Sequence, residues 1–142
     1  MANDRFVSAE YCDDVRQEVG NKISLIGCYG TDMIVGALPA FLPKLCVVVK
    51  LRTPVDQPFG VGTIRLLRDD QSIAEMPVDA TVAGVSGRPE NATWQFLQAV
   101  IALSPFPIEA PCFLRVELEA EGEVILGPKL RIRASLPPVS TT

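Results

Sequence analysis

The chain has 142 residues, a length that favours a single domain able to bury a sizeable core. Its net charge of −4 argues against a nucleic-acid partner, because nucleic-acid binders usually carry a strong basic excess. No apolar run approaches the length of a membrane span, and the N-terminus shows no apolar signal-peptide core. We therefore expect a cytoplasmic protein with no membrane partner.

The first forty residues predict two strands and an irregular connection. Residues 6–15 and 22–29 have strand-like patterning, and Gly20-Asn21 between them tolerates the positive φ of a tight hairpin turn. Residues 31–41 are apolar but broken by Gly36 and Pro39. We expect this segment to pack on the core as a loop.

Residues 42–54 predict the central strand of a sheet, rich in β-branched residues and bracketed by Pro43 and Pro54. One face is wholly apolar: Leu45, Val47, Val49 and Leu51. The other face is apolar in the middle and basic at both ends: Lys44, Cys46, Val48, Lys50 and Arg52. Such a strand needs a core on one side and partial cover on the other.

The remainder predicts further strands at 61–67, 72–78, 112–120 and 124–134, separated by turns that contain Asp, Gly or Pro. Gly127-Pro128 predicts a bulge or an edge strand. Residues 94–103 fit a helix and a strand, and we favour a strand because the neighbouring segments are strand-like. The whole pattern predicts an all-β, single-domain antiparallel β-sandwich of about eight strands, Ig-like or C2-like, over residues 1–134, with a flexible tail at 135–142.

Three segments of the first third carry a family resemblance: CDDVRQE at 12–18, NKISLIGCYG at 21–30 and LPKLCVVVKLRTP at 42–54. They resemble an uncharacterised family of small proteins from bacteria and their phages, classed as a domain of unknown function. The resemblance implies a small β-sandwich-like domain and a bacterial or phage source. It implies no activity.

The residues that usually carry catalysis are scarce. The chain has no histidine, so the usual general base is absent. The four cysteines, Cys12, Cys28, Cys46 and Cys112, lack metal-ligand spacing and sit in apolar strand patterns, which predicts buried, reduced thiols. Cys46 beside Lys44 comes nearest to an activated thiol, but the structural interpretation is favoured. We expect no enzyme, no catalytic residue, no cofactor and no metal.

The candidate partner-binding residues form two groups. Asp13, Asp14 and Arg16 lie near the end of the first hairpin strand, where they could form a local ion-pair network or recognise a partner. Lys44, Lys50 and Arg52 share one face of the central strand, where they could hold an acidic partner or simply reach water at the strand ends. Trp94 and Phe96 are predicted to belong to the core rather than to a stacking platform.

Three functional hypotheses follow. The first is a non-catalytic protein-interaction module, such as a phage or mobile-element accessory or host-modulating protein that binds a protein partner. The second is a self-associating structural or assembly subunit, a homo-oligomer, which the mean hydropathy of +0.25 and the edge strands suggest. The third is a sandwich that binds calcium or a small ligand through carboxylates gathered at its loops.

Overall fold

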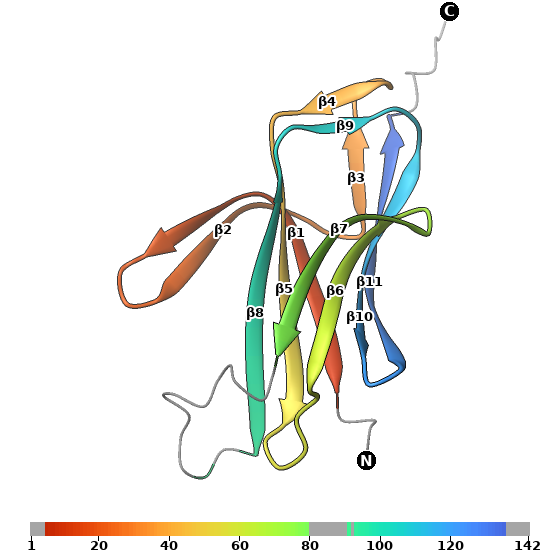
Figure 1. Ribbon diagram of the computed structural model, residues 1–142. Helices are drawn as coiled ribbons and strands as arrows, with labels where there is room; N and C mark the ends of the chain where they lie inside the picture. Colours follow the sequence, from red (N-terminus) through yellow and green to blue (C-terminus); the bar gives the residue numbers. More distant parts are fainter. Residues whose placement is uncertain (1–4, 80–90, 92, 136–142) are drawn as a thin grey trace, which may run out of the picture.

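The computed structural model describes residues 5–79, 91 and 93–135. Within them the chain forms eleven strands and no helix, so no helical segment there could cross a membrane (Figure 1). The strands are β1 (Phe6–Glu18), β2 (Lys22–Tyr29), β3 (Asp32–Val35), β4 (Ala40–Leu42), β5 (Leu45–Pro54), β6 (Val61–Arg68), β7 (Gln71–Asp79), β8 (Trp94–Leu103), β9 (Phe106–Ile108), β10 (Cys112–Ala120) and β11 (Glu123–Ala134).

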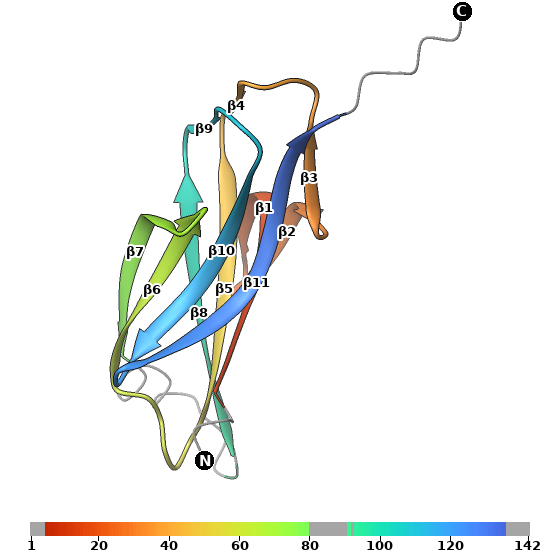
Figure 2. The ribbon, with the colours of Figure 1, turned by 90° about the vertical axis from the view of Figure 1, so that its right-hand side faces the viewer.

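Two larger sheets form the layers of a β-sandwich. Sheet A has the strand order β2-β1-β5-β8, and sheet B has the order β3-β11-β10-β6-β7. Sheet B lies on the right in Figure 1 and faces the viewer in Figure 2. The small sheet β4-β9 lies at one end. The all-β sandwich is thus confirmed, with more strands than predicted and with one parallel pair, β3 and β11, among the antiparallel ones. Residues 80–90 and all of the predicted tail except Ser135 lie outside the described residues.

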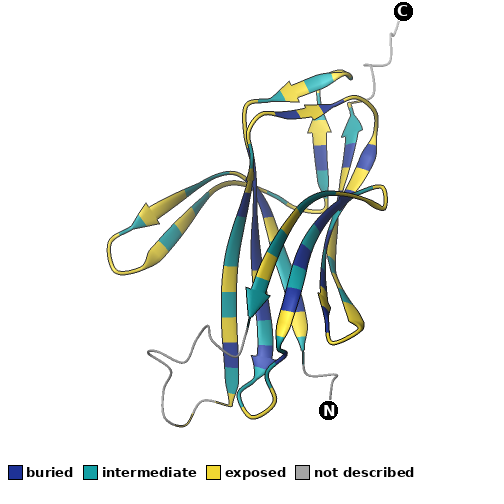
Figure 3. Cartoon of the chain, in the orientation of Figure 1, coloured by how far each residue is buried: buried dark blue, intermediate teal, exposed yellow. Residues whose placement is uncertain are grey.

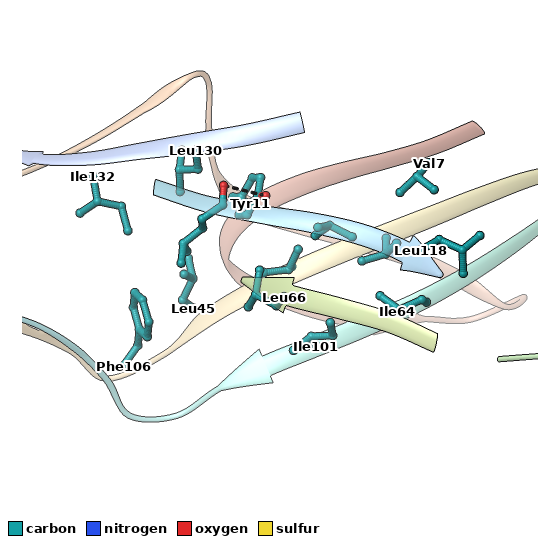
Figure 4. Packing of buried hydrophobic residues seen from close by; sticks show 14 of the residues in the cluster. Val7, Tyr11, Leu45, Ile64, Leu66, Ile101, Phe106, Leu118, Leu130 and Ile132 are labelled. Carbon is teal, nitrogen blue, oxygen red and sulfur yellow. Dashed lines mark hydrogen bonds between the residues drawn. The ribbon is translucent and has the colours of Figure 1, made fainter. Parts of the chain in front are cut away.

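The core lies between the inner faces of the two sheets (Figures 3 and 4). On β5 the predicted apolar face, Leu45, Val47, Val49 and Leu51, is at most 1% exposed. Sheet B contributes buried side chains at alternate positions: Ile64, Leu66, Leu114, Val116, Leu118, Leu130 and Ile132. Apolar side chains at every second residue of the strands in both sheets therefore point into the same core, because successive side chains of a strand point to opposite faces.

The ambiguous segment 94–103 is strand β8, as favoured. It pairs with β5 over ten consecutive residue pairs, from Leu45 opposite Leu103 to Pro54 opposite Trp94, with no register shift. A helix would have left one side of β5 without a hydrogen-bonded neighbour, and buried backbone groups are rarely unpaired.

Tyr11 of β1 joins the two sheets by a hydrogen bond. Its hydroxyl donates to the carbonyl oxygen of Pro128 on β11 at 2.9 Å, and burial raises the pKa of this hydroxyl well above its ordinary value. The acceptor is available because β11 bulges there: Arg115 lies opposite Lys129, whereas Glu117 lies opposite Leu126. At Gly127 an added Cβ would come within 2.9 Å of the Val116 carbonyl oxygen, so a side chain would not fit. The bulge predicted at Gly127-Pro128 is confirmed.

The prediction of a loop over residues 31–41 is wrong. Asp32–Val35 forms β3, which runs parallel to β11, and Ala40–Leu42 forms β4, which pairs with β9. Asp32 accepts two hydrogen bonds from Arg131, at 3.0 and 2.8 Å. Strands of three or four residues are too short to show alternation, and their partners lie far away in the sequence.

The Tyr11 bond predicts a specific loss of stability. Tyr11→Phe removes the donor and leaves the Pro128 carbonyl without its partner, which should lower the free energy of unfolding by about 1–2 kcal/mol. Tyr29→Phe is the matched control, because the Tyr29 hydroxyl donates to an exposed carboxylate, that of Asp13, and its loss should cost less than about 0.5 kcal/mol. Urea unfolding of both variants measures the difference, and equal losses would contradict the role of Tyr11.

The β3–β11 ion pair predicts a dependence on pH. Hydrogen bonds from Arg131 hold the pKa of Asp32 below its ordinary value of 3.8. A depressed pKa stabilises the fold above the ordinary value, and this contribution is lost as the pH falls through the folded-state pKa. The free-energy difference between wild type and Asp32→Asn should therefore be largest near neutral pH and shrink in strong acid. Urea unfolding across that range tests this, and a difference independent of pH would contradict it.

Candidate functional site

The structure divides the six predicted binding residues into two groups. Asp13, Asp14 and Lys44 lie near the base of the hairpin formed by β1 and β2, and Arg16 lies closer to its tip, opposite Ser24. Lys50 and Arg52 lie further along β5, on the outer face of sheet A, which points away from sheet B. The hairpin projects to the left of the sandwich in Figure 1.

The first group is engaged in contacts within the protein. Lys44 Nζ lies 2.8 Å from Asp14 Oδ1, and this bond lowers the pKa of Asp14 and raises that of Lys44. Arg16 Nε lies 3.4 Å from Glu18. Asp13 accepts a hydrogen bond from Tyr29, whose pKa is raised to about 12 by burial and by this carboxylate. The local ion-pair interpretation of these acidic residues therefore fits the geometry.

Gly27 allows the hairpin to bend at this point. It has a φ of 68°, and an added Cβ would lie 2.3 Å from Oδ2 of Asp13. A side chain at residue 27 would thus meet both backbone strain and a clash. At the hairpin tip Gly20 and Asn21 have φ values of 85° and 59°, which confirms the turn predicted there.

The side of the hairpin that carries Val15, Ile23 and Leu25 covers part of the outer face of sheet A. Cys12, Cys46 and Val48 are buried there. These three hairpin residues pack against them, and so does Val100 of β8. Burial raises the pKa of Cys12 to about 11 and also raises that of Cys46. Raising the thiol pKa is the opposite of the activation that a nucleophilic cysteine needs.

One cysteine prediction is wrong. Cys28 is exposed, whereas Cys12, Cys46 and Cys112 are buried, and all four are free thiols. Cys28 lies opposite Cys12 in the β1–β2 ladder but is exposed, as is Ile26, while Ile23 and Leu25 pack against the buried cluster that includes Cys12. The sequence shows an apolar strand but does not show that only one side of this hairpin is covered.

The part of the outer face of sheet A that the hairpin leaves uncovered carries aromatic and basic side chains on neighbouring strands. Phe6 on β1, Arg52 on β5 and Phe96 on β8 lie opposite one another across three strands. Both phenylalanines are exposed, at 56% and 65%, and the Arg52 guanidinium lies 3.7 Å from the centroid of the Trp94 ring. The next row is polar: Ser8, Lys50 and Gln98. We call Phe6, Lys50, Arg52, Trp94 and Phe96 the basic-aromatic face.

The prediction that Trp94 and Phe96 belong to the core is therefore wrong for Phe96, and Trp94 is only half-buried. Both occupy even positions of β8, the parity that faces outward. Because β8 has uncharged residues on both of its faces, its sequence does not reveal which one is buried.

A groove runs from the hairpin to this face. One part, of about 300 Å³, is lined by Ser8, Glu10, Ile23, Leu25, Val48, Lys50 and Gln98. An adjoining part, of about 390 Å³, is lined by Lys50, Phe96, Leu97 and Gln98. Lys50 and Gln98 belong to both parts, so the groove passes beneath the hairpin and opens beside Phe96.

The cations of this face have no acidic partner among the described residues. Seven other basic side chains form ion pairs among the described residues, whereas Lys22, Arg68 and Lys129 form none: the seven are Arg5, Arg16, Lys44, Arg65, Arg115, Arg131 and Arg133. Lys50 and Arg52 form none in that part of the chain, and Nε of Arg52 is buried without a hydrogen-bond partner. This acidic chain thus carries two cations without an ion pair on one face of sheet A, although Glu10 lines the same groove as Lys50.

The acidic turn residues serve the fold. Asp69 and Asp70 both have positive φ between β6 and β7, and Asp69 Oδ1 accepts a hydrogen bond from the Phe113 amide at 2.9 Å. Across residues 5–79, 91 and 93–135, no three His, Cys, Asp or Glu side chains are grouped as metal ligands. The calcium hypothesis stays a prediction.

The Gly27 geometry predicts that a single methyl group loosens the hairpin. Gly27→Ala should lower the free energy of unfolding by about 1–3 kcal/mol, since it combines left-handed strain with the clash against Asp13. Gly30→Ala is the control: an added Cβ there meets nothing within 4 Å and the backbone is not left-handed. Urea unfolding compares the two, and a Gly27→Ala protein as stable as wild type would refute the account of the bend.

Comparison with known proteins gives one match. The model of a family of unknown function, DUF6941, matches residues 8–133. No curated protein and no solved structure matches the chain. Because the family model covers most of the chain, from near the start of β1 to near the end of β11, the protein belongs to the family of unknown function DUF6941.

Proposed function

We propose that this protein is a non-catalytic protein-interaction module and that the basic-aromatic face is its binding surface. The observation that carries the proposal is the row of Phe6, Arg52 and Phe96, in which two exposed rings flank a cation that has no acidic partner in the described residues. Aromatic residues and arginine are enriched at the energetic centres of protein interfaces.

The geometry of Arg52 favours binding at low entropic cost. Its guanidinium already lies against the Trp94 ring, so less side-chain freedom remains to be lost when a partner docks. A guanidinium can also donate two parallel hydrogen bonds to one carboxylate. The partner group that fits this position is therefore an Asp or Glu side chain.

The surroundings define the rest of the partner. Phe6 and Phe96 offer apolar contact on both sides of Arg52, and the groove beneath the hairpin has apolar walls from Ile23, Leu25 and Val48. Lys50 supplies a second cation where the two parts of the groove meet. The surface fits an acidic protein segment that also carries apolar side chains.

Aromatic rings beside cations also suit single-stranded nucleic acid. The charge favours a protein, because the chain has a net charge of −4 and, among the described residues, two cations without an ion pair contribute to this face. Binding of nucleic acid depends on neutralising a row of phosphates. A labelled oligonucleotide serves as a control ligand, and its binding would contradict the proposal.

The biological setting belongs to the same proposal. The resemblance of the first third to proteins of bacteria and their phages supports an accessory or host-modulating protein of a phage or mobile element, acting in the cytoplasm. Its partner would then be a host protein with an exposed acidic and apolar segment.

Affinity capture from bacterial lysates tests the proposed function. The tagged wild type should retain a partner, while Lys50→Glu/Arg52→Glu and Phe6→Ser/Phe96→Ser should each weaken its binding by about 30-fold, the effect of losing about 2 kcal/mol at an interface centre. The controls are Phe41→Ser, at a phenylalanine 66% exposed on β4, and Lys129→Glu on β11. Thermal unfolding confirms that each variant is folded.

Two outcomes would contradict the proposal. One is capture of no specific partner by the wild type. The other is a partner that the face variants retain as well as the controls do.

A further inference from the structure

Strand β8 forms one free edge of sheet A. Among the described residues it pairs with β5 along one side, and no strand lies on its other side. Over Phe96–Leu103 its outward backbone groups therefore form a template on which another strand can add.

The sequence and register of β8 itself show none of the features that normally prevent such pairing. Its sequence, WQFLQAVIAL, contains no charged residue, no proline and no glycine, and its register has no bulge. Natural edge strands are usually protected by charges, prolines, bulges or short length.

The other edges of the described sheets carry these devices. On β7 they are Glu75 and Pro77, and β3 is only four residues long and contains Asp32. On β2, Gly27 has positive φ and Lys22 is exposed. The free half of β11 contains the Gly127-Pro128 bulge. The contrast singles out β8 as an edge that is left open.

We propose that two copies of this chain associate through β8, antiparallel and across a two-fold axis, so that two sheets A become one continuous eight-stranded sheet. A two-fold axis perpendicular to the sheet places even residues opposite even residues, and the outer faces of the two copies stay on one side. Phe96 then lies against outward residues of the partner's β8.

Charge explains why a second copy fits this edge. Two chains of net charge −4 repel each other, yet β8 against β8 sets no like charges opposite one another in any register. β7 against β7 would bring together strands that carry Glu75 and Asp79. An uncharged edge also offers no charge pattern that would select a foreign strand. This association needs no other partner, so it is independent of the proposed function.

Sedimentation velocity on the full chain tests the inference. The wild type should sediment with twice the chain mass of 15.4 kDa. Gln98→Lys and Ala102→Lys, alone and combined, place charges at exposed positions of β8 and should raise the dissociation constant of the dimer at least about tenfold, a loss of about 1.4 kcal/mol. Gln71→Lys makes the matched change on the β7 edge and should leave the dimer intact.

Circular dichroism and thermal unfolding show whether each variant is folded, and the single variants serve if the combined one is not. A wild type that stays monomeric at high concentration would overturn the inference. It would also be overturned if β8 bound a strand of another protein while the chain itself stayed monomeric. A dimer that survives both lysine substitutions would overturn it too, and so would one lost equally in the Gln71→Lys protein.

Discussion

Strand β5 must bury both of its faces, and much of the architecture follows from this constraint. Its odd-numbered residues are covered by sheet B, and Cys46 and Val48 on its other face are covered by the β1–β2 hairpin. A hairpin that leaves the plane of its own sheet needs a bend, and Gly27 opposite Asp13 supplies it. The hairpin reaches only part of the outer face, so Lys50 and Arg52 remain open to a partner beyond its end.

The long strands could be predicted from the sequence because alternation over eight or more residues is a strong signal. The two-sided character of residues 42–54 was readable for the same reason: one parity is apolar throughout, and the other changes from basic to apolar and back. Gly20-Asn21 and Glu121-Gly122 were readable as turns, and all four residues have positive φ. The short strands β3, β4 and β9 could not be found, because three or four residues show no period and their partners are remote in sequence.

The candidate site was accessible only in part. Lys50 and Arg52 were found because they share a parity with Lys44 on one strand. The involvement of Phe6 and Phe96 depends on the strand order β1-β5-β8 and on the register that sets both opposite Arg52, and neither is encoded locally. The clue that the sequence did hold was the even parity of Trp94 and Phe96. It could not be used without knowing which face of β8 points inward.

The reactivity of the four thiols tests most directly whether the hairpin covers the second face of β5. In the folded protein a thiol reagent should modify Cys28 rapidly, while Cys12, Cys46 and Cys112 react only as fast as the protein opens. Peptide mass mapping assigns the label to each cysteine. Rapid modification of Cys46 together with Cys28 in the native state would show that the outer face of β5 is uncovered and would contradict the account.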